Sequence, residues 1–337
     1  MLLESIAIDQ RLKAAWEAAV NGPRLSPADV AELVSVFRQH PPTPAADAVD
    51  DERLADALWA SVVTARVAFV LPEAGLAAYD RLAELFLDGL PLAFSARELG
   101  AAVERALADP ARLNPELLPA LWAVIEGGVG VDITPRVAAL GAAHPPALRD
   151  AYARAMRQHP GFDEFRRRPP MPRLTMEHIT ARAAGSLGDT LYRLIVDNGY
   201  TLDVLDPETV TGYHPELDGP NRYILQTHEI WHLVAGYSTS PGHEVAISGF
   251  QLAQFGHPYS RDFLAAIIAL TTFSAPATAC FVIQLALEGW RHGRRTPPLT
   301  LVDWHGRLDE PVAAIRVGEG VEPYQSLIPD EPPAPVG

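Results

Sequence analysis

Two histidines four residues apart, followed at a fixed distance by a carboxylate, form the pattern in this sequence best suited to chemistry. The stretch from His228 to His232 reads His-Glu-Ile-Trp-His, and eleven residues separate His232 from Glu244. On a helix, side chains four positions apart share one face with their Cβ atoms ~5–6 Å apart, so both imidazoles can bind one divalent ion. We therefore predict a metal site with His228, His232 and Glu244 among its ligands.

A turn must bring the third ligand back to the histidines. The intervening segment is rich in residues typical of turns and helix starts. These residues are Gly236, Ser238, Ser240, Pro241 and Gly242. A helix that opens after them would carry Glu244 in its first turn. Glu229 lies ~100° round the helix from His228, so we expect it to reach the ion obliquely as a fourth ligand or to act through a water as general base. Glu229 and Glu244 are accordingly the predicted catalytic residues.

A chance pair of histidines on a solvated helix face is the alternative interpretation. The apolar neighbours Ile230, Trp231, Leu233 and Val234 argue against it, because buried histidines without a ligand or partner are costly. Two imidazoles and two carboxylates suit zinc, iron or manganese. Zinc is our expectation, whereas oxidative chemistry would favour a redox metal.

His-Glu-x-x-His is also the signature of zinc peptidases. The extended form needs glycine and histidine where this chain has Ala235 and Ser238. Other such peptidases take a glutamate from a later helix, for which Glu244 or Glu288 could be nominated. No edge strand is predicted that could align a peptide. A metallopeptidase stays as an alternative.

The metal pattern and its surroundings resemble the ubiquinone biosynthesis protein four family, whose mark is His-Asp-x-x-His, eleven residues, then Glu. Further fragments follow in the family's order over about residues 173 to 323. They are Gly185-Ser186-Leu187-Gly188, Tyr192, Asn198-Gly199, Arg222-Tyr223, Gln254-Phe255-Gly256-His257-Pro258, Trp304 and Arg316. The chain departs from the family at Glu229, where the family has aspartate. It also carries Ser248 and Gln251 where the family commonly has lysine and glutamate.

The resemblance implies a metal-dependent enzyme that acts on the head group of a polyprenylated benzoate and removes its C1 carboxyl with accompanying oxidation. A divalent ion could orient a carboxylate and a phenolate while Glu229 or Glu244 handles a proton. The substituted Ser248 and Gln251 motivate an alternative from another class, a non-catalytic scaffold that binds prenyl lipids and organises other quinone biosynthetic enzymes. The expected partners are thus a prenylated quinone precursor or another isoprenoid lipid, and other enzymes of the pathway; a homodimer stays open.

A charge-free stretch from Phe263 to Leu287 could line a tunnel for the isoprenoid tail. The predicted lipid-binding residues are Leu264, Ile267, Ile268, Phe281 and Ile283. An ordinary pair of core helices would bury the same side chains. The polar residues and central proline of the stretch argue against a bilayer span. We expect His243 and His257 to lie at the surface or behind the ligands.

The elements that must position these residues are helices, and we predict an all-α fold of two helical regions packed together. Apolar residues recur at three- and four-residue spacing, and caps such as Ser26-Pro27, Asn114-Pro115 and Ser95 with Glu98 precede them. The predicted helices cover 2–21, 26–39, 51–71, 75–88, 95–108, 115–127, 146–158 and 175–198. The proline-rich segment at 166–172 separates an N-terminal region, 1–165, from a metal domain, 173–323. Residues 327–337 are predicted to be a disordered tail.

Composition narrows the class of protein. The chain has 337 residues with 48% hydrophobic residues, enough for a sizeable core. Its net charge of −15 argues against nucleic acid as a partner. The single cysteine excludes an intrachain disulfide and a cysteine-rich metal site. Charged residues interrupt the N-terminal 20 positions before a signal-peptide core could form, so we expect a cytoplasmic protein, peripheral at the membrane if it handles prenyl lipids.

Overall fold

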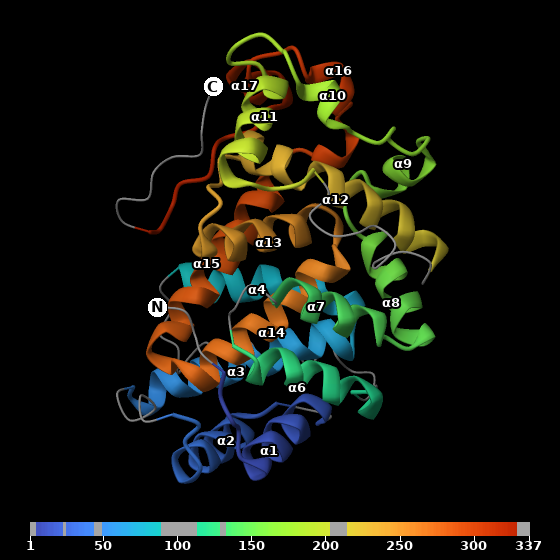
Figure 1. Ribbon diagram of the computed structural model, residues 1–337. Helices are drawn as coiled ribbons and strands as arrows, with labels where there is room; N and C mark the ends of the chain where they lie inside the picture. The colour runs from blue at the N-terminus through green and yellow to red at the C-terminus, as the bar shows by residue number, and fades with distance from the viewer. Residues whose placement is uncertain are drawn as a thin grey trace.

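The protein is built from helices throughout the part of the chain that the structure describes. The computed structural model describes residues 5–22, 25–43, 49–88, 113–128, 133–202 and 214–328. Within these ranges the β-structure consists of one bridge between Ser186 and Pro311. The all-α prediction is confirmed. Figure 1 shows the first helices at one end of the molecule, α10, α11, α16 and α17 at the other, and α13, α14 and α15 between them.

Seven helices make up the N-terminal part of the described chain. They are α1 (Gln10–Asn21), α2 (Pro27–Gln39), α3 (Asp51–Phe69), α4 (Gly75–Leu87), α6 (Leu118–Glu126), α7 (Ile133–Ala142) and α8 (Pro146–Met156). The predicted capping box of α2 is present, with Ser26 accepting from the Asp29 N–H. The predicted start of the first helix at residue 2 is wrong, because Asp9 caps α1 by accepting from the Arg11 N–H. The helix predicted at 95–108 lies outside the described residues.

The C-terminal helices carry the candidate site. They are α9 (Phe162–Arg167), α10 (Met176–Ile179), α11 (Leu187–Asn198), α12 (Pro215–Ala235), α13 (Pro241–Phe255), α14 (Pro258–Ser274), α15 (Pro276–Arg295), α16 (Trp304–Arg307) and α17 (Val312–Glu319). The prediction of a single helix at 175–198 is wrong, because the helix is interrupted between α10 and α11. Ala181 and Gly185 take φ angles of 58° and 80° there. Ser186 then opens α11 by accepting from the Asp189 N–H.

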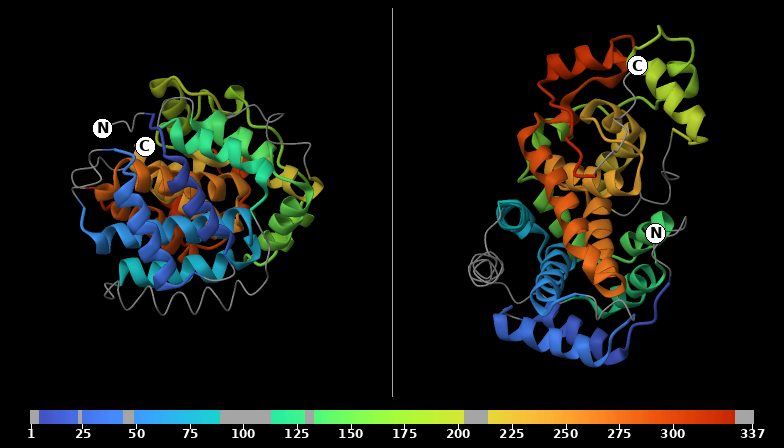
Figure 2. Two further views of the ribbon diagram at one scale, coloured as in Figure 1. Left: turned by 90° about the horizontal axis from the view of Figure 1, so that it is seen from below. Right: turned by 90° about the vertical axis from the view of Figure 1, so that its left-hand side faces the viewer.

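The charge-free stretch from Phe263 to Leu287 forms the later part of α14 and the first part of α15, and these two helices meet at Ala275 before the helix-opening Pro276. Helix α14 is the central element: it packs against α3, α7, α13 and α15, and all of its residues but Tyr259 and Ser274 are buried. Figure 2 shows α3 and α14 side by side. None of the described helices is both long and apolar enough to cross a membrane.

The buried apolar side chains form one cluster that runs from α1 to the segment after α17. The proline-rich segment predicted as a boundary lies between α9 and α10. The division into regions 1–165 and 173–323 stays a prediction, and residues 329–337 of the predicted tail lie outside the described residues. Because the core is shared, the N-terminal helices pack against and support the helices that carry the candidate site.

Candidate metal centre

The end of α12 and the start of α13 hold the candidate ligands. Helix α12 ends at Gly236, whose φ of 84° is the left-handed conformation that favours glycine. The approach is also close, since a Cβ at Gly236 would lie 2.9 Å from the Pro323 Cβ. Helix α13 opens with Ser240 accepting from the His243 N–H and with Pro241 in its first turn. The predicted turn is thereby confirmed.

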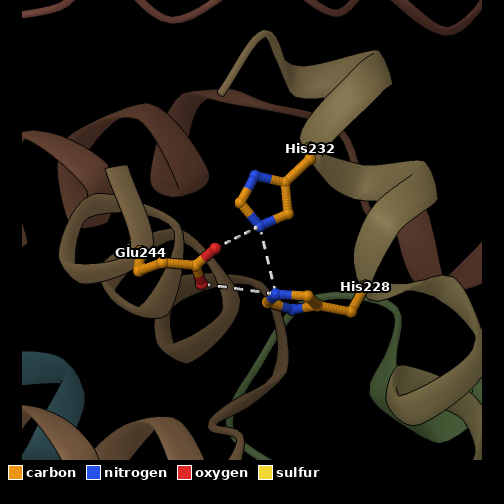
Figure 3. Close-up of side chains that lie close together, drawn as sticks. All are labelled: His228, His232 and Glu244. Atoms are coloured by element: carbon orange, nitrogen blue, oxygen red, sulfur yellow. Dashed lines mark hydrogen bonds and ion pairs between the residues drawn. The ribbon is translucent and has the colours of Figure 1, made fainter. Parts of the chain in front are cut away.

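Three predicted ligands converge on one point (Figure 3). The His228 and His232 Nε2 atoms are 3.0 Å apart. Glu244 places Oε2 3.5 Å from the His228 Nε2 and Oε1 3.3 Å from the His232 Nε2. These are ligand atoms within 4.8 Å of one another, the spacing of donors that can share one ion. The geometry matches the expectation that a helical turn and a returning carboxylate meet.

The contacts behind His232 fit it for coordination. Its Nδ1 lies 2.9 Å from the Ser238 carbonyl oxygen, which can only accept, so Nδ1–H donates. A neutral ring held in this way presents the Nε2 lone pair to the site, as metal-binding histidines usually do. Two imidazoles and one carboxylate are a donor set for zinc, iron or manganese that leaves further coordination positions for a ligand.

The Glu244 carboxylate and the His232 imidazole each stabilise the charged form of the other. Burial alone lowers the pKa of His232, but the Glu244 carboxylate outweighs this effect and raises the pKa to about 9. Desolvation would raise the pKa of Glu244, yet the neighbouring His232 and His228 hold it well below its usual range. At neutral pH the group therefore contains an ionised carboxylate facing a charged imidazole when no ion is bound.

Glu229 is near the group but not in it. The structure does not bring its carboxylate among the clustered ligand atoms, so the predicted fourth ligand is not found in this arrangement. Its charge nonetheless contributes to raising the pKa of His232. The Glu229 Oε2 is buried and has no hydrogen-bond partner among the described residues. A buried orphan carboxylate oxygen beside the site fits the other predicted role, a group that holds or moves a proton.

The group opens into a cavity of about 1230 Å³ with largely apolar walls. His228, Glu229 and Glu244 line it together with side chains from α7, α12, α13, α14 and α15. Of the predicted lipid-binding residues, Ile267 and Phe281 line the cavity. The other three are buried in the core and do not line it. These are Leu264, Ile268 and Ile283. A pocket of this size and lining can enclose a hydrophobic ligand.

Several residues of the site were not singled out as functional from the sequence. Gln251 donates to the His228 Nδ1 over 2.7 Å, and both Gln251 and Ser248 line the cavity. His257 also lines the cavity and is 5% exposed, so it is not a surface residue. His243 is buried as well and bonds the Ser326 hydroxyl over 2.9 Å. The resemblance drew attention to Ser248 and Gln251 only as departures from the family, and their contacts depend on how the helices pack.

Comparisons with known proteins bear on this arrangement. The sequence profile of the family described as coenzyme Q (ubiquinone) biosynthesis protein Coq4 matches residues 133–325. The match starts in α7, earlier than residue 173, where the resemblance in the sequence begins. The structure is also similar to a crystal structure of a proposed ubiquinone biosynthesis protein from Nostoc punctiforme. The two share 22% identity and a TM-score of 0.49 over 61% of this chain and 97% of that chain.

A comparison with curated proteins finds no match. The family match covers more than half of the chain and includes every helix that contributes to the candidate metal centre. This chain therefore belongs to the Coq4 family of ubiquinone biosynthesis proteins.

Proposed function

We propose that this protein is a metal-dependent enzyme of ubiquinone biosynthesis that removes the C1 carboxyl from the head group of a polyprenylated hydroxybenzoate. One observation carries the proposal: His228, His232 and Glu244 converge at the wall of a large apolar cavity. The polar end suits a charged head group and the apolar walls suit a prenyl tail. Membership of the Coq4 family supplies the pathway.

The reaction would balance as an oxidative decarboxylation. The bond between C1 and the carboxyl carbon breaks and this carbon leaves as CO₂. The oxygen that replaces it on C1 comes from dioxygen, whose second oxygen atom leaves as water. The electrons come from the head group itself, which loses the proton of the hydroxyl para to the carboxyl and becomes the quinone. A divalent ion bound to the three residues would act as a Lewis acid toward the substrate's oxygens.

The protein's own residues have separate tasks in this scheme. His232 is held in one tautomer by the Ser238 carbonyl, and the apolar cavity walls exclude bulk water from the head group. Glu229, whose Oε2 is buried and unpaired, accepts the proton that the substrate loses.

Metal content tests the proposal directly. Purified wild-type protein is expected to hold about one divalent ion per chain by elemental analysis, and His232→Ala is expected to lose most of it. His305→Ala is the matched control, since His305 lies away from the group and contacts the Pro172 carbonyl. A wild-type protein free of metal after purification and reloading, or equal metal in both variants, would rule the proposal out.

A prenyl-lipid-binding scaffold is a second candidate, and the size and apolar lining of the cavity favour it. Such a protein would present the lipid to other quinone biosynthetic enzymes without acting on it. Rescue of ubiquinone synthesis in a deficient strain separates the two functions. Full rescue by His232→Ala would support the scaffold, whereas catalysis requires that only wild type and His305→Ala rescue. The metallopeptidase alternative is not proposed, because the described residues include no edge strand that could align a peptide.

A further inference from the structure

A row of hydrogen bonds leads from the metal group to a second histidine of the cavity. The Gln251 amide lies 2.7 Å from the His228 Nδ1 and, at its other end, 3.0 Å from the Ser260 hydroxyl. The same hydroxyl lies 2.9 Å from the His257 Nδ1. Gln251, Ser260 and His257 are all buried, and burial strengthens such hydrogen bonds.

All three hydrogen bonds of this row are donated in the same direction, from His257 toward His228. His257 Nδ1–H donates to Ser260, the Ser260 hydroxyl donates to the Gln251 Oε1, and the Gln251 Nε2 donates to the His228 Nδ1. His228 then carries its proton on Nε2, the atom that faces Glu244. A half-turn of the Gln251 amide exchanges its oxygen and nitrogen and allows the same contacts to run the other way.

An ion bound at His228 requires the opposite direction. Coordination uses the Nε2 lone pair, so the ring must carry its proton on Nδ1 and donate to Gln251. Gln251 then donates to Ser260, and the Ser260 hydroxyl donates to the His257 Nδ1. His257 must in turn place its own proton on Nε2.

We infer that Gln251 and Ser260 couple metal binding at His228 to the tautomer of His257, and that this makes His257 a hydrogen-bond donor to an oxygen of the bound ligand. The inference rests on the proposed function, since it needs an ion at His228. His257 has no hydrogen bond at Nε2 among the described residues, and its ring lines the cavity. The ligand group that suits it is an acceptor such as a carbonyl, carboxylate or phenolate oxygen.

His257 is a neutral ring at neutral pH, so its single ring proton is on either Nδ1 or Nε2. Burial, aided by the charge of Arg261, lowers the pKa of His257 to about 3. With one proton on the ring, a change of direction in the row converts the His257 Nε2 from acceptor to donor. Gln251 and Ser260 are positioning residues, because they act through the histidines at either end.

Nitrogen NMR of the full chain labelled with ¹⁵N-histidine tests the coupling, because protonated and unprotonated ring nitrogens have well-separated shifts. The His257 signals are assigned from their absence in His257→Gln. We expect the His257 proton on Nδ1 in protein treated with a chelator and on Nε2 after zinc is added. The same tautomer in both samples, with zinc bound, would overturn the inference.

Two variants separate the coupling from metal binding. Ser260→Ala should bind zinc like wild type but leave the His257 tautomer unresponsive to it. Gln251→Glu should also bind zinc, because a carboxylate accepts from His228 Nδ1–H. It accepts from Ser260 as well, so His257 should stay protonated on Nδ1 with and without zinc. If His257 still responds in both variants, the row of hydrogen bonds does not carry the effect.

Ligand binding gives an independent readout. A benzoquinone with a short prenyl tail should bind zinc-loaded wild type about threefold to tenfold more tightly than zinc-loaded Gln251→Glu, in which His257 stays protonated on Nδ1; this is the effect of one hydrogen bond. Equal affinities would contradict the donor role of His257. A wild-type protein that binds no zinc would overturn the proposed function together with this inference, whereas zinc binding without a tautomer change overturns the inference alone.

Discussion

At the scale of single residues, the two histidine ligands are supported in different ways. His232 is almost fully buried and bonds a backbone carbonyl, a partner that can only accept. His228 is more exposed and bonds the Gln251 amide, a partner that can either donate or accept. The Nδ1 contact of His232 therefore already has the direction that coordination requires, whereas the Nδ1 contact of His228 must reverse. The two ligands of one site thus contribute differently to the binding free energy.

Zinc binding should release a proton from His232. The Glu244 carboxylate raises the pKa of His232 to about 9, against the lowering effect of burial, so the metal-free ring is charged at neutral pH and must lose its proton to coordinate. We expect about one proton released per zinc near pH 7.5, and an apparent affinity that weakens as the pH falls. Calorimetry in buffers of different ionisation enthalpy measures this release. Glu244→Gln should bind more weakly and release fewer protons; a wild-type release near zero would refute the assignment.

Asp56 on α3 should make stability depend on pH. Burial, with Glu52 and Asp50 nearby, raises the pKa of Asp56 to about 7. The folded state then binds more protons than the unfolded state between about pH 4 and pH 7, so the free energy of unfolding falls as the pH rises through that window. Asp56→Asn removes the ionisation and should be more stable than wild type above pH 7, by at most ~4 kcal/mol. Urea unfolding at pH 5 and pH 8 measures the difference, which should be larger at pH 8.

At the scale of elements, the features that could be predicted from the sequence are those set by residues close together in the chain. Caps such as Ser26 and the four-residue spacing of His228 and His232 act within one helix, and both were predicted. The break between α10 and α11 was missed because helical periodicity continues across it, although Ser186 carries a capping signal. The row from Gln251 to His257 depends on how α13 meets the start of α14, which no local pattern encodes.

The crossing of α13 and α15 should be sensitive to a single added methyl group. A Cβ at Gly289 would lie 1.7 Å from the Ala246 carbonyl oxygen, so Gly289→Ala must push the two helices apart. We expect a loss of ~1–3 kcal/mol in unfolding free energy. Glu244 lies in the same helix as Ala246, so zinc affinity should fall as well. Chemical unfolding and zinc titration measure the two effects.

Gly318 provides the matched control for that substitution. It lies in the exposed part of α17, and a Cβ there meets nothing within 4 Å. Gly318→Ala should be neutral or stabilising by ~0.5–1 kcal/mol, with zinc affinity unchanged. If both alanine variants behave alike, the close helix crossing does not position Glu244.

At the scale of the whole molecule, the cavity is assembled from segments far apart in sequence. Its metal group comes from α12 and α13, and its apolar walls include Ile267 of α14 and Phe281 of α15. Helix α7 closes another side with Ile133 and Val137. Because α7 and α3 both pack on α14, the N-terminal helices determine the shape of the space available to a ligand. Helix α7 is thus part of the cavity wall as well as of the core.

Filling the cavity from α7 should remove the prenyl lipid without removing the metal. Ala138 lines the cavity, and Ala138→Phe would occupy space that a prenyl chain needs, from a helix other than the two that carry the metal ligands. The adjacent Ala139 is exposed and does not line the cavity, so Ala139→Phe adds the same side chain outside it. We expect Ala138→Phe to bind a prenylated benzoquinone at least about tenfold more weakly than Ala139→Phe, with equal zinc content in both. Equal lipid binding would show that the lipid does not extend along α7. Its binding site would then be confined to the helices that carry the metal-binding residues.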